Sequence, residues 1–98
     1  MAAFINGATT DGAEITEVAV TSKFATIDIR GLATNAPAKV TVEHSDDAGV
    51  NWYSHSVIQK DGAIPLVILS GAGLVRANML GLSNRTITTP IVATIAFE

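Results

Sequence analysis

The chain contains no cysteine among its 98 residues. This absence excludes disulfide bonds, thiolate nucleophiles and zinc sites built from cysteine. It is compatible with a reducing compartment but does not require one.

Charge is scarce and dispersed. Charged residues make up 15% of the chain, against about 25% in an average soluble domain. The basic residues are spread singly along the sequence: Lys23, Arg30, Lys39, Lys60, Arg76 and Arg85. Nucleic-acid binding and membrane-surface binding both need clustered basic side chains, so we expect neither partner. A surface with little charge suits a protein packed in an assembly, although an ordinary threonine-rich β-sandwich would have the same composition.

Long hydrophobic runs are also missing. The longest apolar run is Ala63–Leu69, far shorter than the roughly 18 residues that a membrane-spanning helix needs. The first residues, Met1–Ile5, lack the basic start of a signal peptide. We therefore expect a protein that is synthesised and used in a cytoplasm.

The residues that are present favour β-strands. Thr, Ile and Val are abundant, and Gly, Pro, Asn and Asp interrupt the chain at short intervals. Apolar and polar residues alternate over several stretches: Glu14–Thr21, Phe24–Arg30, Ala38–His44, Trp52–Gln59, Leu74–Leu80 and Ile87–Phe97. This pattern predicts a single all-β domain over residues 1–98, an antiparallel β-sandwich of seven to eight short strands, Ig-like or jelly-roll-like.

Two further segments are predicted, one at the edge of a sheet and one at the N-terminus. Ala63–Ser70 is apolar but contains Pro65, which cannot donate a hydrogen bond to a neighbouring strand, so an edge strand or an extended bridging segment is expected. At the N-terminus, Ala2–Ile5 reads as a short strand or as part of an arm covering residues 1–6.

The stretch from Ser45 to Trp52 is the most distinctive in the sequence. It resembles the Asp-box, a hairpin turn motif written Ser-x-Asp-x-Gly-x-Thr-Trp, with Asn51 in the place of threonine. Asp47 can accept hydrogen bonds from backbone N–H groups a few residues on, and Gly49 allows a positive φ. We expect a turn that is tied to itself, with Trp52 buried against the sheet.

Two binding functions compete for the same stretch. Asp46, Asp47 and Asn51 offer oxygen ligands, but the bidentate Glu that closes an EF-hand calcium loop does not follow. Trp52 and Tyr53 could stack on a sugar, but neighbouring residues of a strand point to opposite faces. We therefore expect no metal and no cofactor, and a structural role for Trp52.

The two histidines are the other candidates for chemistry in the sequence. His44 and His55 flank the hairpin and are expected to approach each other across the paired strands. A triad of Ser54 or Ser56 with His55 and Asp61 can be written down, but no nucleophile-elbow pattern accompanies it. We expect no enzymatic activity.

Three stretches in order carry a family resemblance: Phe24–Leu32, Val40–Trp52 and Leu74–Gly81, followed by the alternating C-terminal strand. The resemblance extends over roughly 70 residues, from Phe24 to the C-terminal strand. The chain is similar in this respect to the small β-sandwich virion proteins of tailed bacteriophages, in particular head-decoration, or cement, proteins.

This resemblance implies a non-enzymatic protein that binds the assembled head and stabilises it. The implied partners are the major capsid protein or other virion proteins. Many copies would sit on the particle as a homo-oligomer, of which a trimer is one form. The implied location is the capsid surface, after synthesis in the host cytoplasm. Apolar residues at expected edges are the candidate interface: Phe4, Ile5, Ile64, Pro65 and Leu66. A carbohydrate-binding or adhesion-type β-sandwich module is the alternative.

Overall fold

The computed structural model describes residues 2–8, 12–13, 16–32, 39–80 and 90–98, and within them it contains strands and no helix. The strands are β1 (Ala2–Ala8), β2 (Gly12–Ala13), β3 (Val18–Ala19), β4 (Phe24–Arg30), β5 (Lys39–Ser45), β6 (Tyr53–Ile58), β7 (Gly62–Val67), β8 (Leu74–Leu80) and β9 (Ile91–Phe97). The all-β prediction is confirmed.

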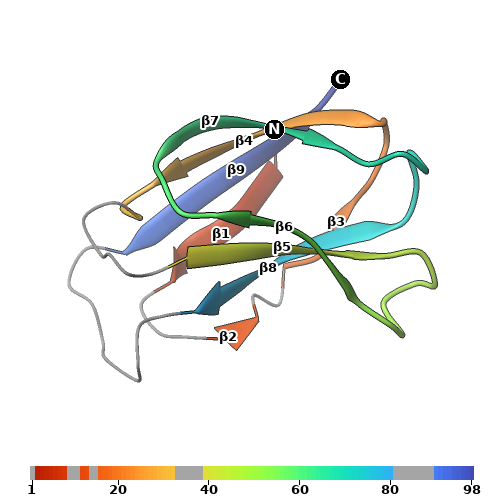
Figure 1. Cartoon of the computed structure of the whole chain (residues 1–98), viewed down its shortest axis with the longest axis horizontal. Helices are drawn as coiled ribbons and strands as arrows, with labels where there is room; N and C mark the ends of the chain where they lie inside the picture. The colour runs from red at the N-terminus through yellow and green to blue at the C-terminus, as the bar shows by residue number, and fades with distance from the viewer. Residues whose placement is uncertain (1, 9–11, 14–15, 33–38, 81–89) are drawn as a thin grey trace.

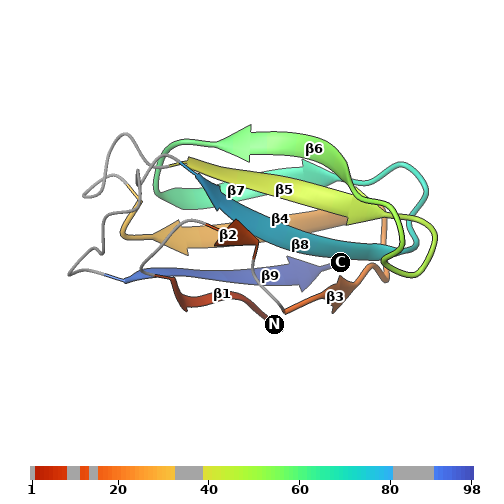
Figure 2. The same ribbon diagram turned by 90° about the horizontal axis from the view of Figure 1, so that it is seen from below.

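The strands form two antiparallel sheets packed face to face. One sheet has the order β1-β9-β4-β7, and the other has the order β2-β8-β5-β6, with β3 also pairing with β8. Figure 1 shows the two layers, with β4, β7 and β9 above β5 and β8. Figure 2 shows the same layers from below, where β6 forms one rim of the molecule.

The pairs are nested along the chain. The β5–β6 hairpin is innermost, β4 pairs with β7 around it, β2 and β3 pair with β8 around these, and β1 pairs with β9 outermost. If β2 and β3 are taken as one interrupted strand, this is the eight-strand connectivity of a jelly roll. The strand order therefore selects the jelly roll over the Ig-like alternative.

The core lies between the sheets and is built from alternate residues of each strand. In β4 the inward side chains of Ala25, Ile27 and Ile29 are buried, as the alternation predicts. Facing them from the other sheet are Val40 and Val42 of β5, with β8 contributing further apolar side chains. Burial of β-branched and other aliphatic side chains from both sheets holds the two layers together.

The N-terminal segment belongs to this core. Phe4 and Ile5 are both completely buried, although neighbouring residues of a regular strand point to opposite faces. The β1–β9 register explains this, because it shifts between Ala3 and Ile5 and leaves Phe4 as an extra residue. In this structure Phe4 and Ile5 are core residues of a paired strand, so they offer no surface to a partner and residues 2–8 do not form an arm.

The proline-containing segment is an edge strand, as predicted. Strand β7 lies at the end of its sheet, and Pro65 stands opposite Thr26 of β4. Along β7, Ile64 is partly buried, Pro65 is exposed and Leu66 is buried. Of the three candidate interface residues in this segment, only Pro65 and Ile64 reach the surface.

Some predicted strand limits differ from the observed ones. Within the predicted strand Glu14–Thr21, only Val18–Ala19 is a strand, and residues 14–15 lie outside the described residues. The last strand begins at Ile91, while the predicted start at Ile87 also lies outside them.

The role of Phe4 can be measured. We expect Phe4→Ala to lower the free energy of unfolding by about 3–5 kcal/mol, because it leaves a cavity in the core. Ala3→Ser, at the exposed neighbouring position, should change it by less than about 0.5 kcal/mol. Urea unfolding followed by tryptophan fluorescence provides both values. Equal, small effects would mean that β1 contributes little to the core.

Candidate functional site

The hairpin between β5 and β6 is tied together by the side chains of its own turn. Ser45 is fully buried, and its hydroxyl donates to Oδ1 of Asp47 at 2.8 Å. The same hydroxyl oxygen accepts the backbone N–H of Gly49 at 2.9 Å. Gly49 has φ +88°, a conformation that favours glycine. The turn therefore has the self-bonded structure that its sequence indicates.

Asp47 is the centre of this turn. Its Oδ1 accepts the backbone N–H of Asn51 at 2.8 Å, and its Oδ2 accepts the side-chain amide of Asn51 at 2.6 Å. The second bond explains how asparagine substitutes for the commoner threonine at this position. Oδ1 thus accepts two hydrogen bonds and Oδ2 accepts one, all from within the turn.

The hydrogen bonds also change the acidity of Asp47. Its pKa is lowered from the ordinary value of 3.8, first by the backbone N–H of Asn51, then by the Ser45 hydroxyl and the Asn51 side chain. All three donors stabilise the charged carboxylate. Asp47 thus keeps its negative charge to a more acidic pH than a free aspartate.

Trp52 packs differently from the prediction, because it is only partly buried. Its indole Nε1–H donates to the carbonyl of Gly49 at 3.1 Å, which closes the turn. The Arg76 guanidinium lies over the indole ring, 4.2 Å from its centroid, and Arg76 Nε donates to Oε1 of Glu43 at 2.8 Å. Glu43 and Arg76 stand opposite each other on β5 and β8, so Trp52 stacks on a cross-strand ion pair.

The two histidines bind backbone carbonyls at the end of β7 and in the β7–β8 connection. Nε2 of His44 lies 2.8 Å from the carbonyl oxygen of Ala72, and Nε2 of His55 lies 2.7 Å from that of Val67. A carbonyl oxygen can only accept, so each Nε2 carries the proton and donates it. Both rings therefore fasten the edge of one sheet to the other, and these nitrogens have no lone pair free for a metal or for general base catalysis.

The direction of His55 follows from a β-bulge. Val42 pairs with Ser56, but the next residue, Glu43, pairs with Ser54, so His55 is an extra residue on β6. A bulge redirects the side chain of its extra residue. Here the side chain turns toward β7 across the open side of the sandwich. The alternation of apolar and polar residues in the sequence gives no sign of this.

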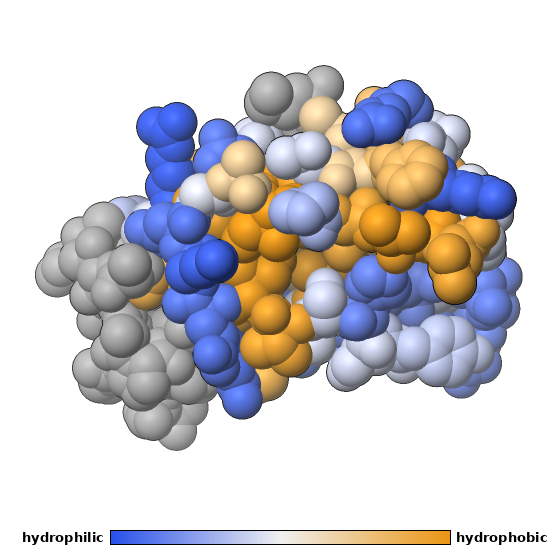
Figure 3. Space-filling model, turned by 45° about the horizontal axis from the view of Figure 1, so that its top comes forward, coloured by the Kyte–Doolittle hydropathy of each residue, from blue (hydrophilic) through white to orange (hydrophobic). Residues whose placement is uncertain are grey.

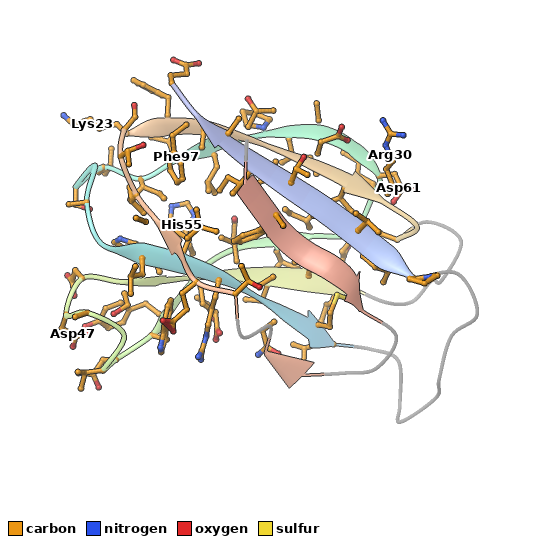
Figure 4. All side chains as sticks on the ribbon, turned by 180° about the vertical axis from the view of Figure 1, so that it is seen from behind. Lys23, Arg30, Asp47, His55, Asp61 and Phe97 are labelled. Carbon is orange, nitrogen blue, oxygen red and sulfur yellow. The ribbon has the colours of Figure 1, made fainter. Side chains whose placement is uncertain are left out.

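His55 and Asp61, which could be written into a triad with Ser54 or Ser56, are not brought together. Asp61 accepts the backbone N–H of Leu32 at 2.7 Å. Figure 4 places Asp61 beside Arg30 toward one end of the molecule and His55 toward the other. Within the part of the chain that the structure describes, no group of three or more His, Cys, Asp or Glu could hold a metal ion.

Gly73 joins the β7–β8 connection to the hairpin. It has φ +96°, and a Cβ at this position would collide with the backbone carbonyl of Ser45 and approach Nε2 of His44. Its own carbonyl accepts the N–H of Val20 at 2.9 Å. Three segments that are distant in the sequence meet at this glycine, and only a residue without a side chain fits between them.

Exposed apolar side chains gather along the open side of the sandwich, where the edge strands β6 and β7 lie. We call the following group the edge patch: Tyr53 and Val57 of β6, Val67 at the end of β7, Leu69 in the connection that follows, and Phe24, which pairs with Val67. Figure 3 shows hydrophobic residues running across the middle of the molecule. The side chains of His44, His55 and Leu69 contribute to a hollow of about 330 Å³ beside the patch.

No protein-family model, curated protein or solved structure matches the chain significantly. The described residues include no helix of the length and hydrophobicity that a membrane span requires.

Asp47 should make the stability of the protein depend on acid. Its pKa is lower in the folded chain than in the unfolded one, so its contribution is complete above about pH 4 and is lost as the pH falls through the folded pKa. Asp47→Asn should reduce stability at neutral pH and flatten this acid dependence. Urea unfolding at several pH values, with the exposed neighbour Asp46→Asn as control, measures the effect. Parallel pH profiles for the wild type and Asp47→Asn would contradict it.

The fit of Gly73 can be tested against a second glycine of positive φ. Gly62 has φ +120° and open space around the Cβ position, so Gly62→Ala should cost only the backbone strain, about 1–3 kcal/mol. Gly73→Ala should cost more, because a collision with the Ser45 carbonyl is added to the strain. Thermal and urea unfolding of both variants give the comparison. The close approach at Gly73 would be refuted by equal losses.

Proposed function

We propose that this chain is a non-enzymatic virion structural protein of a tailed bacteriophage, a decoration or cement protein that binds and stabilises the assembled head. Its partners are the major capsid protein or other virion proteins. It acts on the capsid surface, in many copies, after synthesis in the host cytoplasm.

The edge patch is the observation that carries this proposal. Large apolar side chains are exposed around one open side, from Val67 at 44% to Leu69 at 82%. Contiguous apolar surface on a small soluble domain marks an interaction site. Pro65 and the exposed part of Ile64 belong to the same edge strand, β7, and extend the surface. A surface of this composition is suited to a protein partner.

Two further features support a role in an assembly. The jelly-roll connectivity recurs in viral capsid proteins, although lectins and cupins share it. In addition, the chain has few charges with which to repel neighbouring copies. These features agree with the sequence resemblance to phage decoration proteins.

The geometry favours this role over carbohydrate binding. A sugar platform needs an open aromatic face. Arg76 occupies one face of the Trp52 ring.

Binding to phage heads provides the test. We expect the purified protein to co-sediment with heads of the phage that encodes it, and to raise the temperature at which those heads release DNA. Val67→Asp should weaken the binding by tenfold or more, about 1.4 kcal/mol, because it places a charge in the edge patch. Val92→Asp is the matched control, since Val92 is exposed to 45% and Val67 to 44%, and Val92 lies outside the edge patch.

Two results would reject the proposal. One is a folded wild-type protein that never co-sediments with heads. The other is specific binding on a glycan array, which would support the carbohydrate-binding alternative.

A further inference from the structure

We propose that two copies of this chain associate through strand β6, which pairs with β6 of the second copy in antiparallel orientation across a two-fold axis. The β2-β8-β5-β6 sheet would then continue from one copy into the other. This inference concerns the protein in solution and does not rest on the proposed function.

The edges of the two sheets differ in how well they are protected against pairing. Strand β1 has two register shifts, and β7 contains Pro65. The opposite edge of the second sheet consists of the short pieces β2 and β3, of two residues each. Bulges, proline and short strands are the usual devices against edge-to-edge association.

Strand β6 lacks most of these devices. Its six residues, Tyr53–Ile58, include no proline, glycine or charged residue. Its one irregularity is the bulge at His55, beyond which Ser56, Val57 and Ile58 pair regularly with β5. Among the described strands, β5 alone pairs with β6, and Figure 2 shows β6 at the rim of the molecule. Its outer backbone groups can therefore pair with another extended strand.

Charge complementarity identifies a second copy as the occupant. The acidic residues Asp46 and Asp47 precede β6 in the hairpin, and Lys60 follows its end. Antiparallel pairing brings the end of each β6 to the beginning of the other. Each Lys60 is then directed toward the acidic hairpin of the other copy, and the two-fold axis produces this attraction twice.

The same arrangement covers apolar surface. Val57 and Tyr53 are each exposed to 54% on β6, and both would be shielded by the second copy. Because the strand itself has no charge, the pairing brings no like charges into opposition.

Measurement of the mass in solution tests the pairing. We expect a mass of about twice 10.1 kDa in sedimentation equilibrium or light scattering at micromolar concentration. Val57→Lys should weaken self-association by about tenfold or more, because it places two like charges near the axis. Val92→Lys, at a similarly exposed position on β9, which has neighbours on both sides, should leave it unchanged. A monomer or a trimer in the wild type, or a dimer equally tight in Val57→Lys, would overturn the inference.

A charge exchange tests the orientation and does not rely on Val57. Lys60→Glu should weaken the dimer, and adding Asp46→Lys to it should restore much of the affinity, because attraction returns with the signs reversed. Both side chains are exposed, so the folded state should tolerate the changes. Failure of the double variant to recover affinity would reject the antiparallel two-fold arrangement.

The outcome is independent of phage heads. A dimer that never binds heads leaves this inference intact and removes the proposed function, whereas a monomer that binds heads does the reverse.

Discussion

The carboxylate of Asp47 holds the turn on which the nested strand pairs depend. By accepting both the backbone and the side-chain N–H of Asn51, it closes the connection between β5 and β6. The Ser45 hydroxyl adds a second set of bonds from the buried end of β5. A hairpin of fixed register places β5 correctly for β8, its other neighbour, and the remaining pairs surround this centre.

On the open side of the sandwich, hydrogen bonds connect the two sheets and apolar side chains are exposed to solvent. His44 binds a carbonyl oxygen of the β7–β8 connection and His55 one at the end of β7, and Gly73 permits the close approach near the hairpin. Around these contacts lies the edge patch. Each Nε2 is engaged with a backbone carbonyl, so both rings contribute to holding the two sheets together on this side.

Much of the fold was predictable because it depends on short-range patterns. Alternation in β4 identified its buried face, Pro65 indicated an edge strand, and the spacing of Ser45, Asp47 and Gly49 indicated a turn bonded to itself. One departure from the pattern occurs where a bulge breaks the alternation. At Phe4 an extra residue turns inward, and the N-terminal segment, for which a short strand and an arm were both considered, is a paired strand that contributes to the core. A bulge depends on how two strands align, which a single strand's pattern does not contain.

The sequence by itself determined the all-β class, most of the buried faces and the hairpin turn, since alternation, β-branched side chains and turn chemistry act between near neighbours. The tertiary structure decided the jelly-roll order and the partly exposed position of Trp52. It also decided the direction of His55 and the gathering of apolar residues along β6 and β7. These features arise from contacts between residues far apart in the chain, and their geometry is set only when the two sheets pack.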